Sequence, residues 1–278
     1  MRLATLRTDG GTAAFRVDGD EVVGIPGAAD VGALLADPAW RTRAETADGP
    51  RRALADIADE EWEAVVPRPA KIVCVGLNYR HHILEMGREL PEYPTLFAKY
   101  PEALIGPFDP IVLPAEAADA VDWEAELAVV IGAPARRVKA ADAAAHIAGY
   151  SVLNDITMRD YQYRSPEWFQ GKTFEATTPL GPVLVTPDEY DLTSELRGAV
   201  DGETVQRTTT DDLVFPPDVL IEYISAIFTL NPGDVIATGT PGGVGHARKP
   251  PRYLRPGEVL TTSIAGIGEL RNAVVADA

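Results

Sequence analysis

The sequence predicts an α+β protein that is mostly β, with a small N-terminal α/β domain followed by a larger domain built on a rolled or sandwiched sheet. Two observations support this prediction. Beyond residue 70, short apolar segments are separated by turn residues at close intervals, which is typical of sheets that fold back on themselves. The regular alternation of strand and helix that marks a doubly wound sheet is missing from the same part of the chain.

The N-terminal part of the chain is predicted to be a separate module. Short alternating segments before residue 25 are typical of strands, and the Ala-rich segments after them are typical of helices. The segment VPRP at residues 66–69 is expected to be a stiff, extended linker, because proline opposes both a helix and a central strand. We therefore expect one domain at residues 1–66 and a second at residues 70–278.

Composition and charge argue against several classes of function. The chain has 278 residues, 46% of them hydrophobic, so it can bury a full core. It carries 25 Lys and Arg against 42 Asp and Glu, a formal net charge of −17, which disfavours binding to nucleic acid or to anionic membranes. An acidic substrate therefore needs local positive charge, either from a bound metal or from a few placed Lys and Arg residues.

The expected location of the protein is cytoplasmic. The single cysteine, Cys74, lies in an apolar run, so we expect a buried strand residue and neither a disulfide nor a nucleophile. The N-terminal segment lacks the apolar core of a signal peptide, and no stretch reaches the roughly 18 apolar residues of a membrane span.

Three carboxylates lie in or at the end of apolar, strand-like segments. The run VDWEAELAVVI at residues 121–131 has a period of two that places Glu124 and Glu126 on one face, roughly 7 Å apart. Asp155 ends a second apolar segment, GYSVLND. Buried carboxylates repel one another unless a cation or protons compensate them, and three such ligands suit Mg²⁺ or Mn²⁺. The alternatives are a solvent-facing strand edge for the glutamates and a cap or turn for Asp155.

Two of the four histidines fall in a segment with helical spacing. In GLNYRHHILE, Glu85 follows His82 by three residues and His81 by four, so it shares a helical face with either. A carboxylate beside an imidazole raises the basicity of the ring, as activation of a water molecule requires. A surface helix with a chance pair of these residues is the alternative.

Further polar residues follow Asp155. Arg159, Gln162 and Lys172 offer the positive charge and the hydrogen-bond donors that an anionic substrate needs in an acidic protein, although each residue alone is more often a surface residue. The loop TGTPGGVG at residues 238–245 offers backbone donors at close approach. It matches neither common glycine-rich nucleotide-binding pattern, so we expect no nucleotide site.

Taken together and in this order, several segments resemble the fumarylacetoacetate hydrolase family, from about residue 72 to residue 272: GLNYRHHILE, WEAELAVVIG, NDITMRDYQ, GKTF, LGPVLVTPDE and PGDVIATGTPGGVG. The order is far more specific than any one segment. The resemblance implies a mixed β-sheet roll, commonly a homodimer, with a small N-terminal domain in the longer bacterial members.

The resemblance also implies roles for individual residues. Three match the family's metal carboxylates, usually with Mg²⁺ or Mn²⁺ and with Ca²⁺ as an alternative: Glu124, Glu126 and Asp155. His82 and Glu85 match a dyad on a short lid helix, and Lys172 matches a lysine near the metal. Three more fall on positions that contact substrate: Arg159, Gln162 and Thr240. His81 stands where the motif usually has aspartate, which leaves open which imidazole is the base.

The function that the resemblance implies is metal-dependent hydrolysis of a carbon–carbon bond in a small 2-oxo acid, such as an acylpyruvate or a diketo acid. Water activated by His82 and Glu85 would attack the distal carbonyl, and Lys172 would stabilise the oxyanion. Decarboxylation of an oxaloacetate-type acid and isomerisation of a 2-hydroxydienoate use the same enolate and are the alternatives. A catalytically silent metal- or ligand-binding protein is the non-enzyme alternative.

Overall fold

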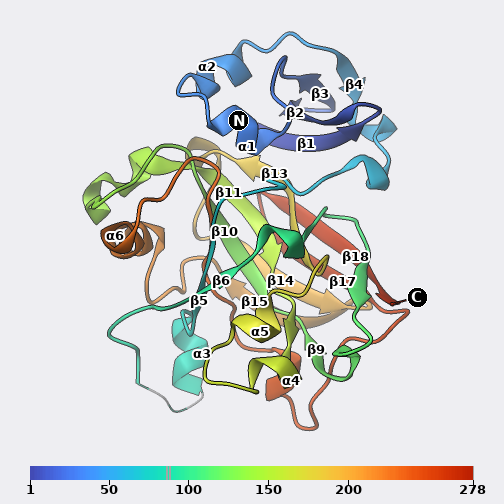
Figure 1. Ribbon diagram of the computed structural model, residues 1–278, viewed down its shortest axis with the longest axis vertical. Helices are drawn as coiled ribbons and strands as arrows, with labels where there is room; N and C mark the ends of the chain where they lie inside the picture. The colour runs from blue at the N-terminus through green and yellow to red at the C-terminus, as the bar shows by residue number, and fades with distance from the viewer. Residues whose placement is uncertain (86, 88, 278) are drawn as a thin grey trace.

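The computed structural model describes residues 1–85, 87 and 89–277, except for the side chains of His82 and Glu85. Within these residues strands predominate and form mixed sheets, and the helices are few and short (Figure 1). The predicted fold class, α+β and mostly β, is confirmed. No helix in the described part of the chain is long and apolar enough to cross a membrane.

The largest sheet has 11 strands among the described residues. In order across the sheet they are β4 (Arg51–Ala53), β3 (Glu21–Gly24), β2 (Gly11–Asp18), β1 (Arg2–Thr8), β13 (Thr178–Val185), β11 (Ile147–Asn154), β10 (Ala125–Ile131), β16 (Val235–Ala237), β5 (Ile72–Gly76) and β6 (Thr95–Lys99), with β7 (Leu104–Ile105) paired to β13. Most neighbours are antiparallel, but β16 pairs with β5, and β13 with β7, in parallel. This combination makes the sheet mixed.

Two smaller sheets and six α-helices also lie in the described part of the chain, together with short 3-10 segments. The five-stranded sheet consists of β15 (Glu203–Thr209), β14 (Glu195–Val200), β17 (Val259–Ile264), β18 (Gly268–Ala276) and β8 (Ile111–Leu113), and the two-stranded sheet of β12 (Thr157–Met158) and β9 (Val121–Asp122). The helices are α1 (Val31–Leu35), α2 (Trp40–Glu45), α3 (Arg80–Glu85), α4 (Arg159–Gln162), α5 (Phe169–Lys172) and α6 (Pro217–Ile227).

The N-terminal module holds β1 to β4 with α1 and α2, and it lies at the top of Figure 1. The first three strands fall where the alternating pattern predicted strands, and α1 and α2 follow them as predicted, but β4 was not predicted. Its strands pair in sequence order, and β1 joins the rest of the large sheet through β13, with Arg2 opposite Val185. The boundary between residues 66 and 70 stays our proposal.

Strands β10 and β11 lie at the centre of the large sheet, and every one of their residues is buried. Leu127 and Val129 of β10 belong to a hydrophobic cluster that includes α6 and the five-stranded sheet, whereas Ala128 and Val130 belong to one that includes α1 and α2. Burial on both faces explains why β10 is a nearly continuous apolar run in the sequence. The predicted burial of Cys74, in β5, is also confirmed.

Gly149 in β11 leaves no room for a side chain. A Cβ atom added there would lie 2.4 Å from the carbonyl oxygen of Val185 and 2.5 Å from Cδ2 of Leu184, both in β13. We predict that Gly149→Ala lowers the free energy of unfolding by about 1–3 kcal/mol, because the two strands must shift apart. Urea denaturation checks this. The control Gly10→Ala places its methyl group in open space and should change stability by less than about 0.5 kcal/mol. Equal losses in both variants would contradict the steric argument.

Candidate active site

The three carboxylates predicted from the sequence meet at one end of β10 and β11. Glu124 directly precedes β10, Glu126 is its second residue, and Asp155 directly follows β11. Because the two strands are antiparallel, with Ala125 opposite Asn154, the backbone N–H of Asp155 donates to the carbonyl of Glu124 over 2.8 Å. One ligand oxygen from each carboxylate lies within 4.8 Å of the others, and all three side chains are buried. We call these residues the carboxylate cluster.

Lys172, at the end of α5, joins two members of the carboxylate cluster. Its Nζ donates to Oε2 of Glu124 and to Oδ2 of Asp155, each over 2.7 Å. Burial lowers the pKa of Lys172, but the charges of Asp155 and Glu124 outweigh burial and raise this pKa above its usual value. Lys172 therefore carries a proton at neutral pH.

Two more buried cations compensate the carboxylate cluster. Nζ of Lys99 donates to Oδ1 of Asp155 over 2.5 Å. Burial raises the pKa of Asp155, but Lys172 and Lys99 more than offset burial, so this pKa is lowered. Nη2 of Arg159 lies 2.8 Å from Oε1 of Glu124 and 2.8 Å from Oδ2 of Asp122. Glu124 and Asp155 are thus both held by ion pairs with buried cations.

Glu126 is the member of the cluster that has no cationic partner among the described residues. Its Oε2 accepts a hydrogen bond from the N–H of Gly239 over 2.8 Å. Burial, and after it the charges of Asp155 and Glu124, raise the pKa of Glu126 well above its usual value. A divalent cation would restore the balance of charge at this point, and carboxylate oxygens are the ligands that hard cations prefer. The donor set therefore fits a bound metal.

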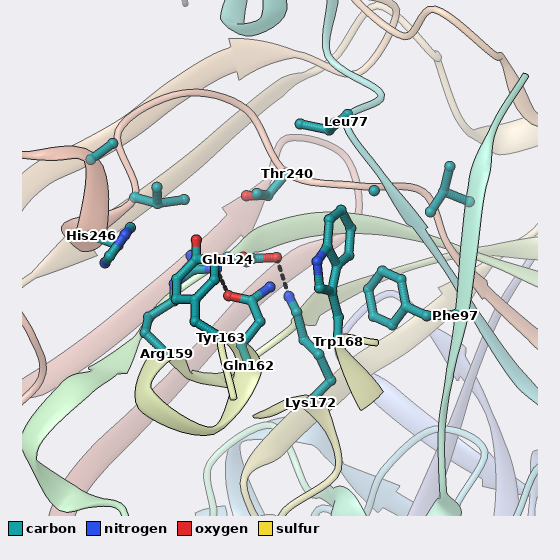
Figure 2. A pocket seen from close by; sticks show the side chains of 14 residues that line it. Leu77, Phe97, Glu124, Arg159, Gln162, Tyr163, Trp168, Lys172, Thr240 and His246 are labelled. Carbon is teal, nitrogen blue, oxygen red and sulfur yellow. Dashed lines mark hydrogen bonds and ion pairs between the residues drawn. The ribbon is translucent and has the colours of Figure 1, made fainter. Parts of the chain in front are cut away.

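A cavity of about 300 Å³ includes Glu124 and Lys172 in its lining. Figure 2 shows this pair between two aromatic sides, with Trp168 and Phe97 on one side and Tyr163 and His246 on the other. The rings of Trp168 and Phe97 meet edge to face, with centroids 5.5 Å apart. The volume is at the lower end of the range for ligand pockets, so the cavity fits a small molecule.

Gln162 and Thr240 also line the cavity, and their hydrogen bonds limit what each can offer to a ligand. Nη1 of Arg159 donates to Oε1 of Gln162 over 2.9 Å, so the Nε2 group of Gln162 is left as a donor without a partner among the described residues. The hydroxyl of Thr240 donates to the carbonyl of Ala125 over 3.0 Å and accepts from Nε2 of Gln206 over 2.8 Å. The Thr240 hydroxyl can therefore only accept a hydrogen bond from a ligand.

Helix α3 contains the predicted histidine segment. Nδ1 of His81 lies 2.6 Å from Oδ1 of Asp212, and the His81 side chain is exposed. The side chains of His82 and Glu85 lie outside the described residues. The predicted dyad, and the question of which imidazole acts as base, therefore stay predictions.

Several residues of the site were not predicted from the sequence. Lys99 ends β6 and Asp122 ends β9, and both side chains are fully buried. The available signal for both was a charged residue at the end of an apolar strand. Trp168, Tyr163 and His246 line the cavity, but no local pattern distinguishes them from ordinary loop residues.

Comparison with known proteins places the chain in a family. The family model described as fumarylacetoacetate (FAA) hydrolase C-terminal matches residues 71–275. The chain belongs to the fumarylacetoacetate hydrolase family. The mitochondrial oxaloacetate tautomerase FAHD2A of Bos taurus is 45% identical over 216 residues, which are 76% of this chain and 68% of that protein.

Solved structures agree with this assignment over the whole chain. Fumarylacetoacetate hydrolase from Exiguobacterium antarcticum matches with a TM-score of 0.89 at 34% identity, and 100% of both chains is covered. The 5-carboxymethyl-2-hydroxymuconate delta-isomerase from Mycobacterium smegmatis matches with a TM-score of 0.82 at 37% identity, again over 100% of both chains. The family resemblance inferred from the sequence is confirmed.

Two lysine ion pairs differ in burial, and we expect their loss to cost different amounts of stability. We predict that Lys99→Met lowers the free energy of unfolding by about 3 kcal/mol, because it removes one partner of a buried pair with Asp155. The matched control, Lys139→Met, breaks an exposed pair with Glu222 and should cost no more than about 1 kcal/mol. Urea denaturation of both variants in the presence of a chelator measures the difference. Similar losses in the two variants would show that Lys99 does not compensate the carboxylate cluster.

Proposed function

We propose that this family member is a divalent-metal-dependent tautomerase or isomerase that interconverts the keto and enol forms of a small 2-oxo acid. The observation that carries the proposal is the position of Lys172, a buried ammonium group that bridges the carboxylate cluster and lines the cavity. The relatives support it, because the names of the Bos taurus tautomerase and the Mycobacterium smegmatis delta-isomerase both describe rearrangements within one molecule.

The carboxylate cluster would hold the metal through Glu124, Glu126 and Asp155. Three carboxylate ligands favour Mg²⁺ or Mn²⁺, with Ca²⁺ as an alternative. When bound, the ion supplies a Lewis acid that makes the protons on C3 of a 2-oxo acid more acidic. In this proposal Glu126 is the ligand that most needs the ion, since it has no cationic partner among the described residues.

Lys172 would move the proton. In the direction of the keto form, its Nζ gives a proton to C3 of the enol and takes one from the enol oxygen. The substrate thus exchanges an O–H bond for a C–H bond, and Lys172 regains its proton. Nε2 of Gln162, held in place by Arg159, would donate to a carboxylate oxygen of the substrate. The rings of Trp168 and Phe97 would exclude water from one side of the reacting carbon atoms.

Hydrolysis of a carbon–carbon bond is the second candidate. The match to the Exiguobacterium antarcticum hydrolase, with its TM-score of 0.89, favours it. Hydrolysis needs an activated water molecule in addition to a stabilised enolate, and His82 and Glu85 remain the proposed dyad for that step. Product analysis separates the candidates, because an isomer, two acid fragments or carbon dioxide would each identify one reaction. A homodimer and a cytoplasmic location remain predictions.

Metal binding can be tested separately from turnover. At a Mn²⁺ concentration about 100-fold above its Kd, we expect the Tm of the protein to rise by roughly 5–10 °C. Glu126→Gln should remove most of this rise, because it takes away a charged ligand. The control Glu222→Gln changes an exposed glutamate paired with Lys139 and should keep the full rise. An undiminished rise in Glu126→Gln would rule out the proposed metal ligands.

Enolisation can be followed as the exchange of C3 protons for deuterium in heavy water, by proton NMR. We expect the protein with Mg²⁺ or Mn²⁺ to accelerate this exchange in oxaloacetate, and we expect a chelator to abolish the effect. Lys172→Met should lower the rate by roughly 10²- to 10⁴-fold, because it removes the proton carrier, whereas Lys139→Met should not. Metal binding without exchange above the protein-free rate would contradict the enzymatic proposal and favour a binding protein.

A further inference from the structure

His246 adds a polar side chain to the cavity, away from the Lys172–Glu124 pair. It lies in a short 3-10 segment (Gly245–Ala247) after β16, and both it and Tyr163 line the cavity. The two rings stack, with centroids 5.1 Å apart and planes tilted by 36°. Figure 2 shows them on the opposite side of the Lys172–Glu124 pair from Trp168. A ligand that reaches from Lys172 across the cavity would therefore meet His246.

Asp122 fixes the backbone of His246 relative to the rest of the site. Oδ2 of Asp122 accepts from the N–H of His246 over 2.9 Å and from Nε of Arg159 over 2.8 Å. Oδ1 accepts from the N–H of Gly245 over 2.6 Å. One buried carboxylate thus ties the loop of His246 to Arg159, which in turn pairs with Glu124.

Tyr253 orients the imidazole ring. Its hydroxyl lies 2.9 Å from Nδ1 of His246. Burial, followed by the charge of Asp122, raises the pKa of Tyr253, so the phenol keeps its proton and can donate it to Nδ1. With Nδ1 accepting, the proton of the neutral ring is on Nε2. Nε2 has no partner among the described residues, and it is thus a free donor.

The absence of a carboxylate partner among the described residues distinguishes His246 from the other basic residues of the cavity. Lys172 and Arg159 are both paired with carboxylates. Among the described residues that line the cavity, His246 is the basic side chain that no carboxylate engages. A second carboxylate on the substrate, in a protein of net charge −17, needs such a donor at the outer end of the cavity.

We propose that His246, positioned by Tyr253 and Tyr163, binds the distal carboxylate of a dicarboxylic 2-oxo acid and so sets a preference for dicarboxylic over monocarboxylic substrates. This inference rests on the proposed function, because it assumes that the 2-oxo end of the ligand lies at Lys172. The stack with Tyr163 and the bond to Tyr253 hold the ring in one orientation, which lowers the entropy lost when the ligand binds.

A matched pair of ligands tests the proposal. Oxaloacetate and 2-oxobutanoate differ in that a carboxylate of the first is a methyl group in the second. Their Kd values can be measured by tryptophan fluorescence in the presence of Mg²⁺, since Trp168 lines the cavity. We expect the wild type to prefer oxaloacetate by roughly 10- to 100-fold, as one charge-assisted hydrogen bond allows. His246→Ala should bring this ratio close to one, and His246→Gln, which keeps an N–H donor, should retain part of it.

Tyr253→Phe separates orientation from direct contact. It removes the hydroxyl that holds Nδ1, and it should lower the affinity ratio by roughly 2- to 10-fold, less than His246→Ala does. An unchanged ratio in His246→Ala overturns the proposal, and so does an equal loss of affinity for both ligands, because that would be a structural effect. Failure of the proposed function has a different signature: the wild type would bind oxaloacetate selectively without accelerating C3 exchange.

Discussion

The burial of three carboxylates at the end of two apolar strands is the constraint on which the rest of the structure depends. β10 and β11 are buried along their whole length, so Glu126 and Asp155 lose their hydration. The fold compensates with cations from distant parts of the chain, Lys99 from β6 and Lys172 from α5. Removing either lysine would leave a less compensated buried charge. Electrostatic compensation therefore fixes β6 and α5 against the central strands, in addition to apolar packing.

The short helices α4 and α5 follow from the same constraint, because they must bring Lys172 close to strands that are already packed. Gly171, directly before Lys172, makes this approach feasible. A Cβ atom there would lie 2.5 Å from the backbone nitrogen of Gln162 and 2.5 Å from the carbonyl oxygen of Met158. The absence of a side chain at Gly171 lets α5 pack closely against α4, which carries Gln162. The glycine thus places the proposed proton carrier and the proposed substrate donor together.

Local sequence patterns predicted the part of the site that depends on local geometry. The period of two in β10 puts Glu124 and Glu126 on one face whatever the partner strand is. The position of Lys99 beside Asp155 could not be predicted in this way, because it depends on the pairing of β5 with both β6 and β16, contacts that link residues far apart in the chain. Spacing likewise allowed Glu85 to pair with either His81 or His82, and it could not predict the contact of His81 with Asp212 of a distant loop.

The site has two parts with different origins, and the difference bears on chemistry. The inner part of the cavity includes Glu124, which directly precedes β10, and Lys172, which ends α5; strand pairing and buried charge hold both residues. The outer end comes from the loop of His246 and from Tyr163 after α4, and its anchors are one carboxylate, Asp122, and one phenol. Loops accept substitutions that a buried ion-pair cluster does not. In the proposed function the same enolate chemistry can serve different substrates, in line with relatives that carry the names tautomerase, isomerase and hydrolase.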